Sequence, residues 1–339
     1  MATGATRVLM DTPVWAWGVF GALILTMIAV DLFLFERRPH ARGLKEAAVW
    51  SVVWVALALA FNVGVYFLKD GELALQFTTA YLLEKSLSVD NLFIFLVIFR
   101  FFGVEERYQP RVLFWGILGA LVMRAILIGA GVSLLHSFGW VMYIFGAILI
   151  YTGVKLFVAK DESYEPSQTL AYRLTRRYVR LTEQYHAEHF FVREGGKLLA
   201  TPLFLVLVIV ETTDLVFAVD SIPACLGVSQ DLFIVYTSNV FAILGLRALY
   251  FVLAGLMGHL RFLKPALAIV LAFIGVKMSL AEAIKGGLMA EPWSSRLHIS
   301  TGVSLAVVGG ILASAVVASL LYPKKDDGKK PQMNADEHR

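Results

Sequence analysis

Two groups of oxygen-bearing side chains interrupt segments that are otherwise apolar. They are Glu84, Asp90 and Asn91 in one segment, and Glu211, Asp214, Asp220 and Ser221 in another. A charge at the bilayer centre costs about 2.5–3.5 kcal/mol on insertion scales, and such residues usually mark an ion or substrate path. We therefore interpret the two groups as a cation site inside a membrane.

Helical spacing places several of these side chains together. Glu84 and Asn91 share a helix face, and Asp90 lies about a third of a turn away near mid-depth. Glu211 and Asp214 are neighbours one turn apart, also near mid-depth. We expect Asp90 and Asp214 to face each other and to form an all-oxygen cage with Glu84, Glu211 and Asn91. Asp220 is expected near the outer end of its segment.

The chemistry of such a cage favours a hard divalent cation. Carboxylate-rich sites suit Mg²⁺, Ca²⁺ or Mn²⁺, whereas thiolate and imidazole sites suit Zn²⁺ and Cu⁺, and we expect no Cys or His beside this one. A divalent cation would compensate two or three carboxylates. Without it, several carboxylates must be protonated or paired, so proton counter-transport is physically available.

Three basic residues are candidate counter-charges for the cage. Lys85 follows Glu84 directly, and Arg124 and Arg247 fall near mid-depth of two further apolar segments. The arginines serve equally well to pin helices together by ion pairs or to take part in transport. On their own, Ser221, Ser238 and Asn239 fit hydrogen bonding between helices better than metal binding.

The composition identifies the class of protein that must position these residues. Hydrophobic residues make up 58% of the 339 residues and charged residues only 17%, against about 25% charge in soluble domains. The chain is therefore predicted to be an all-α, polytopic membrane protein. Its net charge of +4 lies mostly in loops and in the tail, so it indicates no nucleic-acid partner, and the bilayer is the expected environment.

About nine apolar segments are long enough to cross roughly 30 Å of hydrocarbon. They lie near 14–35, 46–68, 76–101, 111–135, 139–159, 199–222, 231–257, 264–284 and 298–322. Lys and Arg gather in every second loop and in the tail, which predicts an outside N-terminus and a cytoplasmic C-terminus.

The sequence contains an internal repeat. Residues 144–155 resemble residues 266–277, Arg124 corresponds to Arg247, and Asp90-Asn-Leu-Phe corresponds to Asp214-Leu-Val-Phe. Each copy holds three segments, so the second copy enters the membrane from the opposite side. An inverted 3+3 helix repeat with a midplane site is a transporter architecture.

The repeat divides the chain into five parts. They are a two-span region at 1–75, the first repeat at 76–159, a cytoplasmic loop at 160–198, the second repeat at 199–284, and a last span with tail at 285–339. Within the loop, residues 170–181 are predicted to form a basic amphipathic helix and residues 190–199 a hairpin that turns at Gly195-Gly196. His186, Glu188 and His189 fit a solvated loop better than a metal site.

Several long motifs resemble those of the TerC family of membrane proteins, most closely its Alx branch. They are Glu84-Lys-Ser-Leu-Ser-Val-Asp-Asn-Leu-Phe, Glu211-x-x-Asp-x-x-Phe-Ala-Val-Asp-Ser-Ile-Pro-Ala224, Thr237-Ser-Asn-x-Phe-Ala-Ile-Leu-Gly-Leu-Arg-Ala248 and His189-Phe-Phe-Val-Arg193. The resemblance implies a manganese exporter of the bacterial inner membrane, related to proteins named for tellurite resistance. It also implies that the seven oxygen-bearing residues of the two groups belong to the metal path.

The resulting hypothesis is a secondary-active exporter with Mn²⁺ as its transported substrate and no organic cofactor. Export of Ca²⁺, Mg²⁺ or another divalent ion is the second transport hypothesis. A membrane scaffold in the response to metal or tellurite stress is the alternative from another class. An enzyme is not expected, because the apolar segments hold no Ser–His pair and the chain has no nucleotide-binding loop.

Overall fold

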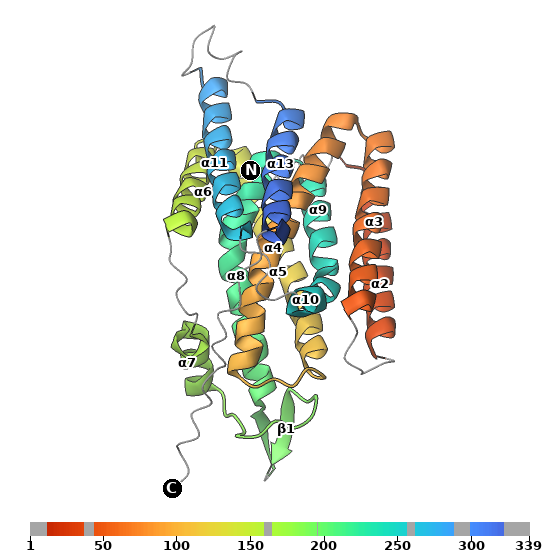
Figure 1. The fold of residues 1–339 in the computed structure, drawn as a ribbon, viewed down its shortest axis with the longest axis vertical. Coiled ribbons are helices and arrows are strands. Elements are labelled where there is room, and N and C mark those ends of the chain that lie inside the picture. The colour runs from red at the N-terminus through yellow and green to blue at the C-terminus, as the bar shows by residue number, and fades with distance from the viewer. Residues whose placement is uncertain are drawn as a thin grey trace.

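The computed structural model describes residues 12–36, 44–158, 165–194, 196–255, 262–287 and 299–321, and within these ranges the chain is predominantly helical. The long helices are α2 (Val14–Glu36), α3 (Leu44–Leu68), α4 (Gly71–Phe101), α5 (Gln109–Ser137), α6 (Val141–Val158), α8 (Pro202–Val228), α11 (Leu263–Lys285) and α13 (Thr301–Leu321). Two shorter ones, α9 (Leu232–Leu244) and α10 (Leu246–Gly255), follow each other directly. The helices form one upright bundle, with α2 and α3 side by side at one edge (Figure 1).

Six of these helices are long and apolar enough to cross a membrane, or seven when α9 and α10 are taken as one bent span. Helix α4 also lies in a predicted span, but Glu84, Lys85 and Asp90 keep its middle from meeting the same criterion. The described side chains of α2, Val14–Val30, form a shorter apolar stretch. The prediction of a polytopic helical protein is confirmed, whereas the count of nine spans stays a prediction.

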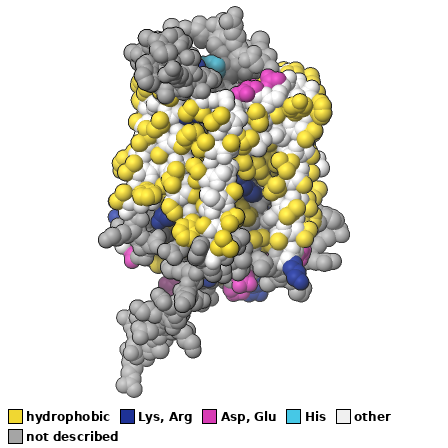
Figure 2. Space-filling model, turned by 45° about the horizontal axis from the view of Figure 1, so that its top comes forward, with side chains coloured by type: hydrophobic (Ala, Val, Ile, Leu, Met, Phe, Trp, Pro, Cys, Tyr) yellow, Lys and Arg dark blue, Asp and Glu magenta, His cyan; other side chains and the backbone are white. Residues whose placement is uncertain are grey.

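The surface of the bundle agrees with a lipid environment. On the face seen in Figure 2, hydrophobic side chains cover the middle and most of the charged side chains lie near the two ends. Large apolar residues such as Leu25, Val52 and Ile126 are well exposed on three different helices. Exposing such an apolar surface to water would be energetically unfavourable, but its contact with lipid hydrocarbon carries no such penalty.

Aromatic rings pack α2 and α3 against the rest of the bundle. Phe61 of α3 contacts Phe20 of α2 at 5.6 Å, Phe77 of α4 at 5.6 Å and Phe241 of α9 at 4.8 Å between ring centroids. All three pairs are tilted, with interplanar angles of 49°, 44° and 42°, and their centroid distances lie in the range of favourable ring contacts. The N-terminal helices are therefore anchored on the two helices that later supply Glu84 and Asn239 to the candidate site.

Helices α6 and α11 cross at glycines. A Cβ at Gly275 would lie 2.7 Å from the carbonyl oxygen of Gly146, and a Cβ at Gly153 would lie 2.7 Å from that of Ala268. Small residues let two backbones approach this closely inside a membrane. The two helices therefore pack backbone to backbone along their crossing.

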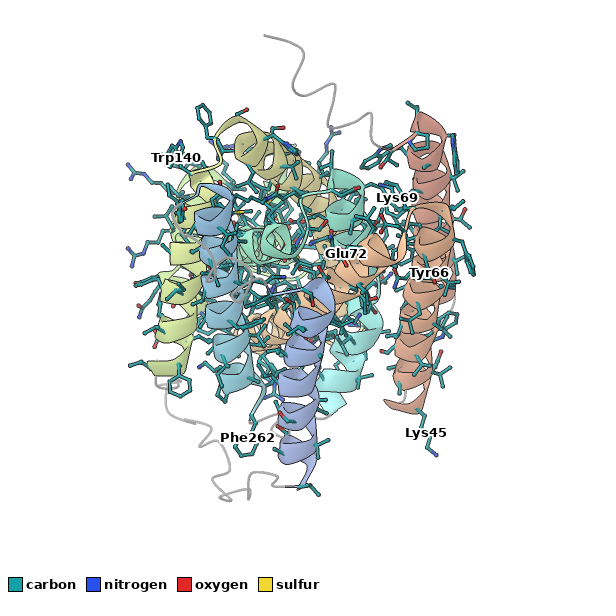
Figure 3. The ribbon with its side chains drawn as sticks, turned by 90° about the horizontal axis from the view of Figure 1, so that it is seen from above. Lys45, Tyr66, Lys69, Glu72, Trp140 and Phe262 are labelled. Atoms are coloured by element: carbon teal, nitrogen blue, oxygen red, sulfur yellow. The ribbon has the colours of Figure 1, made fainter. Side chains whose placement is uncertain are left out.

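The ends of the bundle carry polar links. Lys69, after the end of α3, donates hydrogen bonds of 2.7 Å to Asp231 and to Thr12, and Asp231 caps the first turn of α9 through Phe233 and Ile234. Thr301 of α13 donates to Glu72 at the start of α4. Seen from above, Lys69 and Glu72 lie inward of Lys45 and Tyr66 (Figure 3).

The segment between α6 and α8 holds a short helix and a hairpin, as the sequence predicts. Helix α7 runs from Leu170 to Tyr178, and strands β1 (Phe191–Glu194) and β2 (Lys197–Ala200) pair antiparallel. Tyr185 ties this segment to the bundle, since its hydroxyl donates to the carbonyl of Phe102 at 2.6 Å. Burial raises the pKa of Tyr185 to about 12, so the hydroxyl remains a donor throughout the physiological pH range.

The orientation predicted from Lys and Arg is open to a labelling experiment. A cysteine in place of Leu198 on β2 is expected to resist impermeant thiol reagents in intact cells, and one in place of Trp140 is expected to react, because the two positions lie at opposite ends of the bundle. Both native side chains are exposed, at 64% and 59%, so burial does not limit labelling. Ser229, on the same loop side as Trp140 in the predicted topology, is unsuitable because it is 4% exposed. Labelling of both positions after permeabilisation is the control, and the reverse pattern in intact cells would contradict the predicted orientation.

Candidate site around Arg124

Four helices, α4, α5, α8 and α9, pack against one another at the centre of the bundle. Their apolar residues belong to two hydrophobic cores, and buried polar residues form a polar layer among these helices. Arg124 of α5 is the largest fully buried side chain of the part of the chain that the structure describes. Each of the other three helices contributes a polar group to it, and this layer is the candidate site.

Arg124 binds two carboxylates on different helices. Its Nη1 donates to Glu84 Oε1 of α4, and on α8 its Nη2 and Nε donate to the two oxygens of Asp214 at 3.2 and 3.4 Å. Nη1 also lies 2.8 Å from Asn239 Oδ1 of α9 and 3.3 Å from Ser221 Oγ. One guanidinium thus joins all four helices, since its planar fork presents five donors in fixed directions.

Glu84 is fully buried and receives further donors. Asn239 Nδ2 donates to its Oε2 at 3.3 Å and Ser88 Oγ donates to its Oε1 at 3.4 Å. The thiol of Cys225 lies 3.8 Å from Oε2 and 3.5 Å from Asn239 Nδ2. The expectation that no Cys lies beside the acidic residues is therefore wrong, because Cys225 is one helical turn from Ser221 and shares its face of α8.

The cluster carries more negative than positive formal charge. Arg124 supplies one cation and Glu84 and Asp214 supply two anions, so with all groups ionised one negative charge remains uncompensated. Charges interact far more strongly here than in water, because little solvent screens them. A further cation that joins the cluster therefore gains electrostatic stabilisation.

Glu211 lies on the same helix as Asp214 but binds no described residue by a hydrogen bond or an ion pair. Its carboxylate is seated against the backbone of α5 at Gly119, where a Cβ would lie 2.5 Å from Glu211 Cδ and 2.6 Å from its Oε2. Any larger residue would displace the carboxylate or push α5 from α8. Gly119, which the sequence alone does not single out, thus leaves the space on α5 that this carboxylate occupies.

The remaining predicted residues lie in different surroundings. Asp220 accepts a hydrogen bond of 2.9 Å from Thr152 of α6 and takes no part in the hydrogen bonds around Arg124. Asn91 is buried on α4. Asp90 belongs to α4, but its side chain lies outside the described part of the chain.

Lys85 and Arg247, the other two predicted counter-charges, lie apart from the Arg124 cluster. Lys85 donates to the carbonyl of Ala242 at 3.3 Å, beside the 43° bend between α9 and α10. Gly245 at this bend leaves room for the ammonium group, which would lie 2.8 Å from a Cβ there. The Arg247 guanidinium lies over the ring of Phe114, 5.6 Å from its centroid.

The described side chains do not form the all-oxygen cage expected from the sequence. Among them, no group of three or more His, Cys, Asp or Glu residues is arranged to hold a metal ion. Glu84 and Asp214 do converge, but around a guanidinium, and the carboxylate of Glu211 lies against α5. The seven-residue metal path implied by the resemblance stays a prediction.

Replacing Arg124 tests the energetic coupling in this cluster. Arg124→Gln leaves two buried carboxylates without their cation, and such a loss typically costs 3–5 kcal/mol of folding stability. The double variant Glu84→Gln, Arg124→Gln is expected to cost less than the sum of the two single changes, by about 0.5–3 kcal/mol, as for residues in direct contact. Thermal unfolding in detergent measures both quantities.

The matched control is Arg107→Gln, which removes an arginine from the exposed pair with Glu105 and is expected to leave the unfolding temperature unchanged. Additive costs for Glu84 and Arg124 would contradict the coupling.

Replacing Gly119 tests the seat of Glu211. Gly119→Ala is expected to destabilise the protein by about 1–3 kcal/mol through overpacking. Adding Glu211→Asp, which is one methylene shorter, should recover most of that loss. The control is Gly129→Ala on the same helix, where nothing lies within 4 Å of the added Cβ, so a small gain in stability is expected. Equal stability of Gly119→Ala and Gly129→Ala would show that the contact between Glu211 and Gly119 does not affect folding.

Comparison with known proteins places this arrangement in a family. The model of the integral membrane protein TerC family matches residues 69–327, which include every residue of the Arg124 cluster. An uncharacterized membrane protein of Myxococcus xanthus is 47% identical over 305 residues, covering 90% of this chain and 92% of that protein. No solved structure matches.

Two further relatives share one name. The Escherichia coli K12 protein named "Putative membrane-bound redox modulator Alx" is 46% identical over 324 residues, covering 93% of this chain and 97% of its own. Its namesake in Salmonella typhi is 44% identical over 323 residues, covering 92% and 96%. The family match over most of the chain and these similarities along nearly its full length lead to one conclusion: the chain belongs to the TerC family of integral membrane proteins and is Alx-like.

Proposed function

We propose that this protein exports a divalent metal ion, with Mn²⁺ as its principal substrate, across the bacterial inner membrane by secondary active transport. The observation that carries the proposal is the convergence of Glu84 and Asp214, from two different helices, on one buried point at Arg124. Burying two carboxylates at one point inside hydrocarbon is energetically unfavourable, so such a pair usually marks a place where a cation binds. Their oxygen chemistry suits Mn²⁺, Mg²⁺ or Ca²⁺, and the resemblance to the TerC family favours manganese.

Arg124 has a definite role in this proposal. Its guanidinium makes the hydrogen bonds to Glu84 and Asp214 that a metal ion would replace with coordination bonds. Arginine and metal therefore compete for the same oxygens. A divalent ion that enters must weaken at least one of the two ion pairs. Arg124 then keeps its hydrogen bonds to Asn239 and Ser221.

Such a competition provides a reason for alternating states. With Arg124 bound to both carboxylates, α5 is tied to α4 and α8. When a metal ion coordinates one of these carboxylates, the coordination bond replaces an ion pair with Arg124. The packing of these helices can change with it. A ligand shifts a conformational equilibrium only through such differential interactions with the two states.

Proton exchange is the proposed source of energy. Carboxylates must be ionised to bind a metal ion, so metal binding releases protons from any that carry one. The excess of carboxylates over arginine in the cluster gives it the capacity to hold a proton. Exchange of metal for protons would let an inward proton gradient drive export.

The crossing of α6 and α11 supports the inverted-repeat part of the proposal. The repeat pairs Gly146 with Ala268 and Gly153 with Gly275, because both pairs are 122 positions apart. In the structure Gly146 meets Gly275, and Gly153 meets Ala268. A two-fold axis through the crossing converts one contact into the other, as expected for two copies that enter the membrane from opposite sides.

The broken helix fits the same architecture. Transporters of this kind often build their sites beside interrupted helices, whose free backbone groups bind ions. The chain bends by 43° between α9 and α10, and Lys85 donates a hydrogen bond to the carbonyl of Ala242 next to the bend. We place Lys85 as the cation that stabilises this interruption.

The name of the Alx relatives suggests redox modulation as a second candidate. The chain has one cysteine, so it cannot form an intrachain disulfide. Cys225 is fully buried beside Glu84, where it is poorly placed for exchange with thiols in solution. An effect on cellular redox state would then be a consequence of metal export.

Neutral replacement of the aspartates tests the proposal. Asp214→Asn and Asp90→Asn are each expected to abolish manganese tolerance in cells that lack their own exporters, because an amide removes the charge that the metal ion needs. Both variants should still reach the membrane in normal amounts. The matched control is Glu105→Gln, an exposed carboxylate outside the membrane spans, which should leave tolerance unchanged.

Uptake into proteoliposomes from a panel of Mn²⁺, Mg²⁺ and Ca²⁺ identifies the substrate. Selective Mn²⁺ flux that Asp214→Asn removes would support the proposal. Full tolerance in both aspartate variants would instead favour the scaffold alternative, since a scaffold does not need ionised groups in the membrane.

A further inference from the structure

Helix α7 presents an unusual surface outside the membrane spans. Leu170, Leu174 and Tyr178 are spaced four residues apart, so they form one stripe along the helix. All three are exposed, at 73%, 45% and 74%. Apolar side chains of this size are normally covered when they line up on a soluble segment.

The side of the helix next to this stripe packs against the bundle. Ala171 and Thr175 are buried, and α7 packs against α8. Because the buried and the exposed apolar positions are neighbours on the helix, they form one broad apolar face of which α8 covers only part. The exposed stripe is thus a continuation of the packed face toward the outside of the bundle.

Basic side chains border this stripe. The exposed arginines in and just after α7 are Arg173, Arg176, Arg177 and Arg180. No acidic residue lies between Leu170 and Glu183. The guanidinium groups of Arg176 and Arg177 lie over the rings of Tyr172 and Tyr178, which keeps them along the helix surface.

The position of α7 in the chain places it between two candidate membrane spans. The preceding span candidate, α6, ends at Val158, and the next, α8, begins at Pro202. Figure 1 shows α7 at the periphery of the bundle, beside α8 and below α6. A short helix with an apolar stripe, arginine flanks and this location has the features of an interfacial helix.

We propose that α7 binds the surface of the surrounding bilayer, with its apolar stripe in the headgroup region and its arginines on anionic lipid headgroups. The charge complementarity selects this occupant: four cations and no anion around an apolar stripe fit an anionic membrane surface. Each basic residue near such a surface contributes about a fivefold preference. The inference does not depend on which ion the protein transports.

The experiment uses the full-length protein in lipid nanodiscs. Leu174→Cys is labelled with an environment-sensitive fluorophore, and a neutral aqueous quencher reports its exposure. Native Cys225 is fully buried and does not compete for the label. In phosphatidylcholine with phosphatidylglycerol, quenching at position 174 is expected to fall several-fold relative to phosphatidylcholine alone, and high salt is expected to reverse the change.

Two variants separate lipid binding from folding. Replacing Arg173, Arg176 and Arg177 with Gln should restore quenching in anionic nanodiscs, whereas replacing them with Lys should not. The control probe is Leu198→Cys on β2, which is expected to be quenched equally in both lipids and in every variant, showing that the hairpin remains folded.

Shielding of position 174 that is equal in both lipids, or that survives the Gln variant, would overturn the proposal. Shielding that requires an added soluble protein fraction would also overturn it, because it would identify a protein partner for the stripe.

Discussion

A single arginine buried in the membrane core sets the main constraint on this structure. Arg124 cannot remain there without anionic partners, because an isolated charge in a medium of low dielectric is very costly. Glu84 and Asp214 supply the anions, and Asn239 and Ser221 occupy further donor directions. These partners come from three helices, so the position of α5 fixes how α4, α8 and α9 can pack. Under the proposed function, a metal ion would act through the same carboxylates, so one cluster would serve both packing and transport.

The rest of the bundle supports this cluster through close helix contacts. Glycines at 146, 153 and 275 let α6 and α11 meet backbone to backbone, while Gly119 gives the carboxylate of Glu211 a place against α5. Inside a membrane the hydrophobic effect does not drive helices together, so close packing and buried hydrogen bonds must do so. Close backbone contacts join α6 to α11, and aromatic ring contacts join α2, α3, α4 and α9.

Much of this arrangement could be predicted from the sequence. Apolar length located the helices, and charges at mid-depth identified Glu84, Asp214 and Arg124 as one system. The register of neighbouring helices could not be predicted, because a single sequence does not show which face of α8 contacts α5. For this reason Glu211, which lies against Gly119, was assigned to the cage, and Asp220, which accepts a hydrogen bond from Thr152, was assigned to the same metal path. Cys225 was missed although its four-residue spacing from Ser221 placed it on the correct face, because no cysteine was expected beside the carboxylates.

Direct measurement of Mn²⁺ binding tests the central claim that Arg124 and a divalent ion share Glu84 and Asp214. Titration calorimetry of the purified protein in nanodiscs, in two buffers with different ionisation enthalpies, gives both the affinity and the number of protons released. We expect wild-type protein to bind Mn²⁺ with proton release, and the double variant Glu84→Gln, Asp214→Asn to lose at least tenfold in affinity together with that release. Unchanged Mn²⁺ affinity in the double variant would contradict the account and place the metal path elsewhere in the bundle.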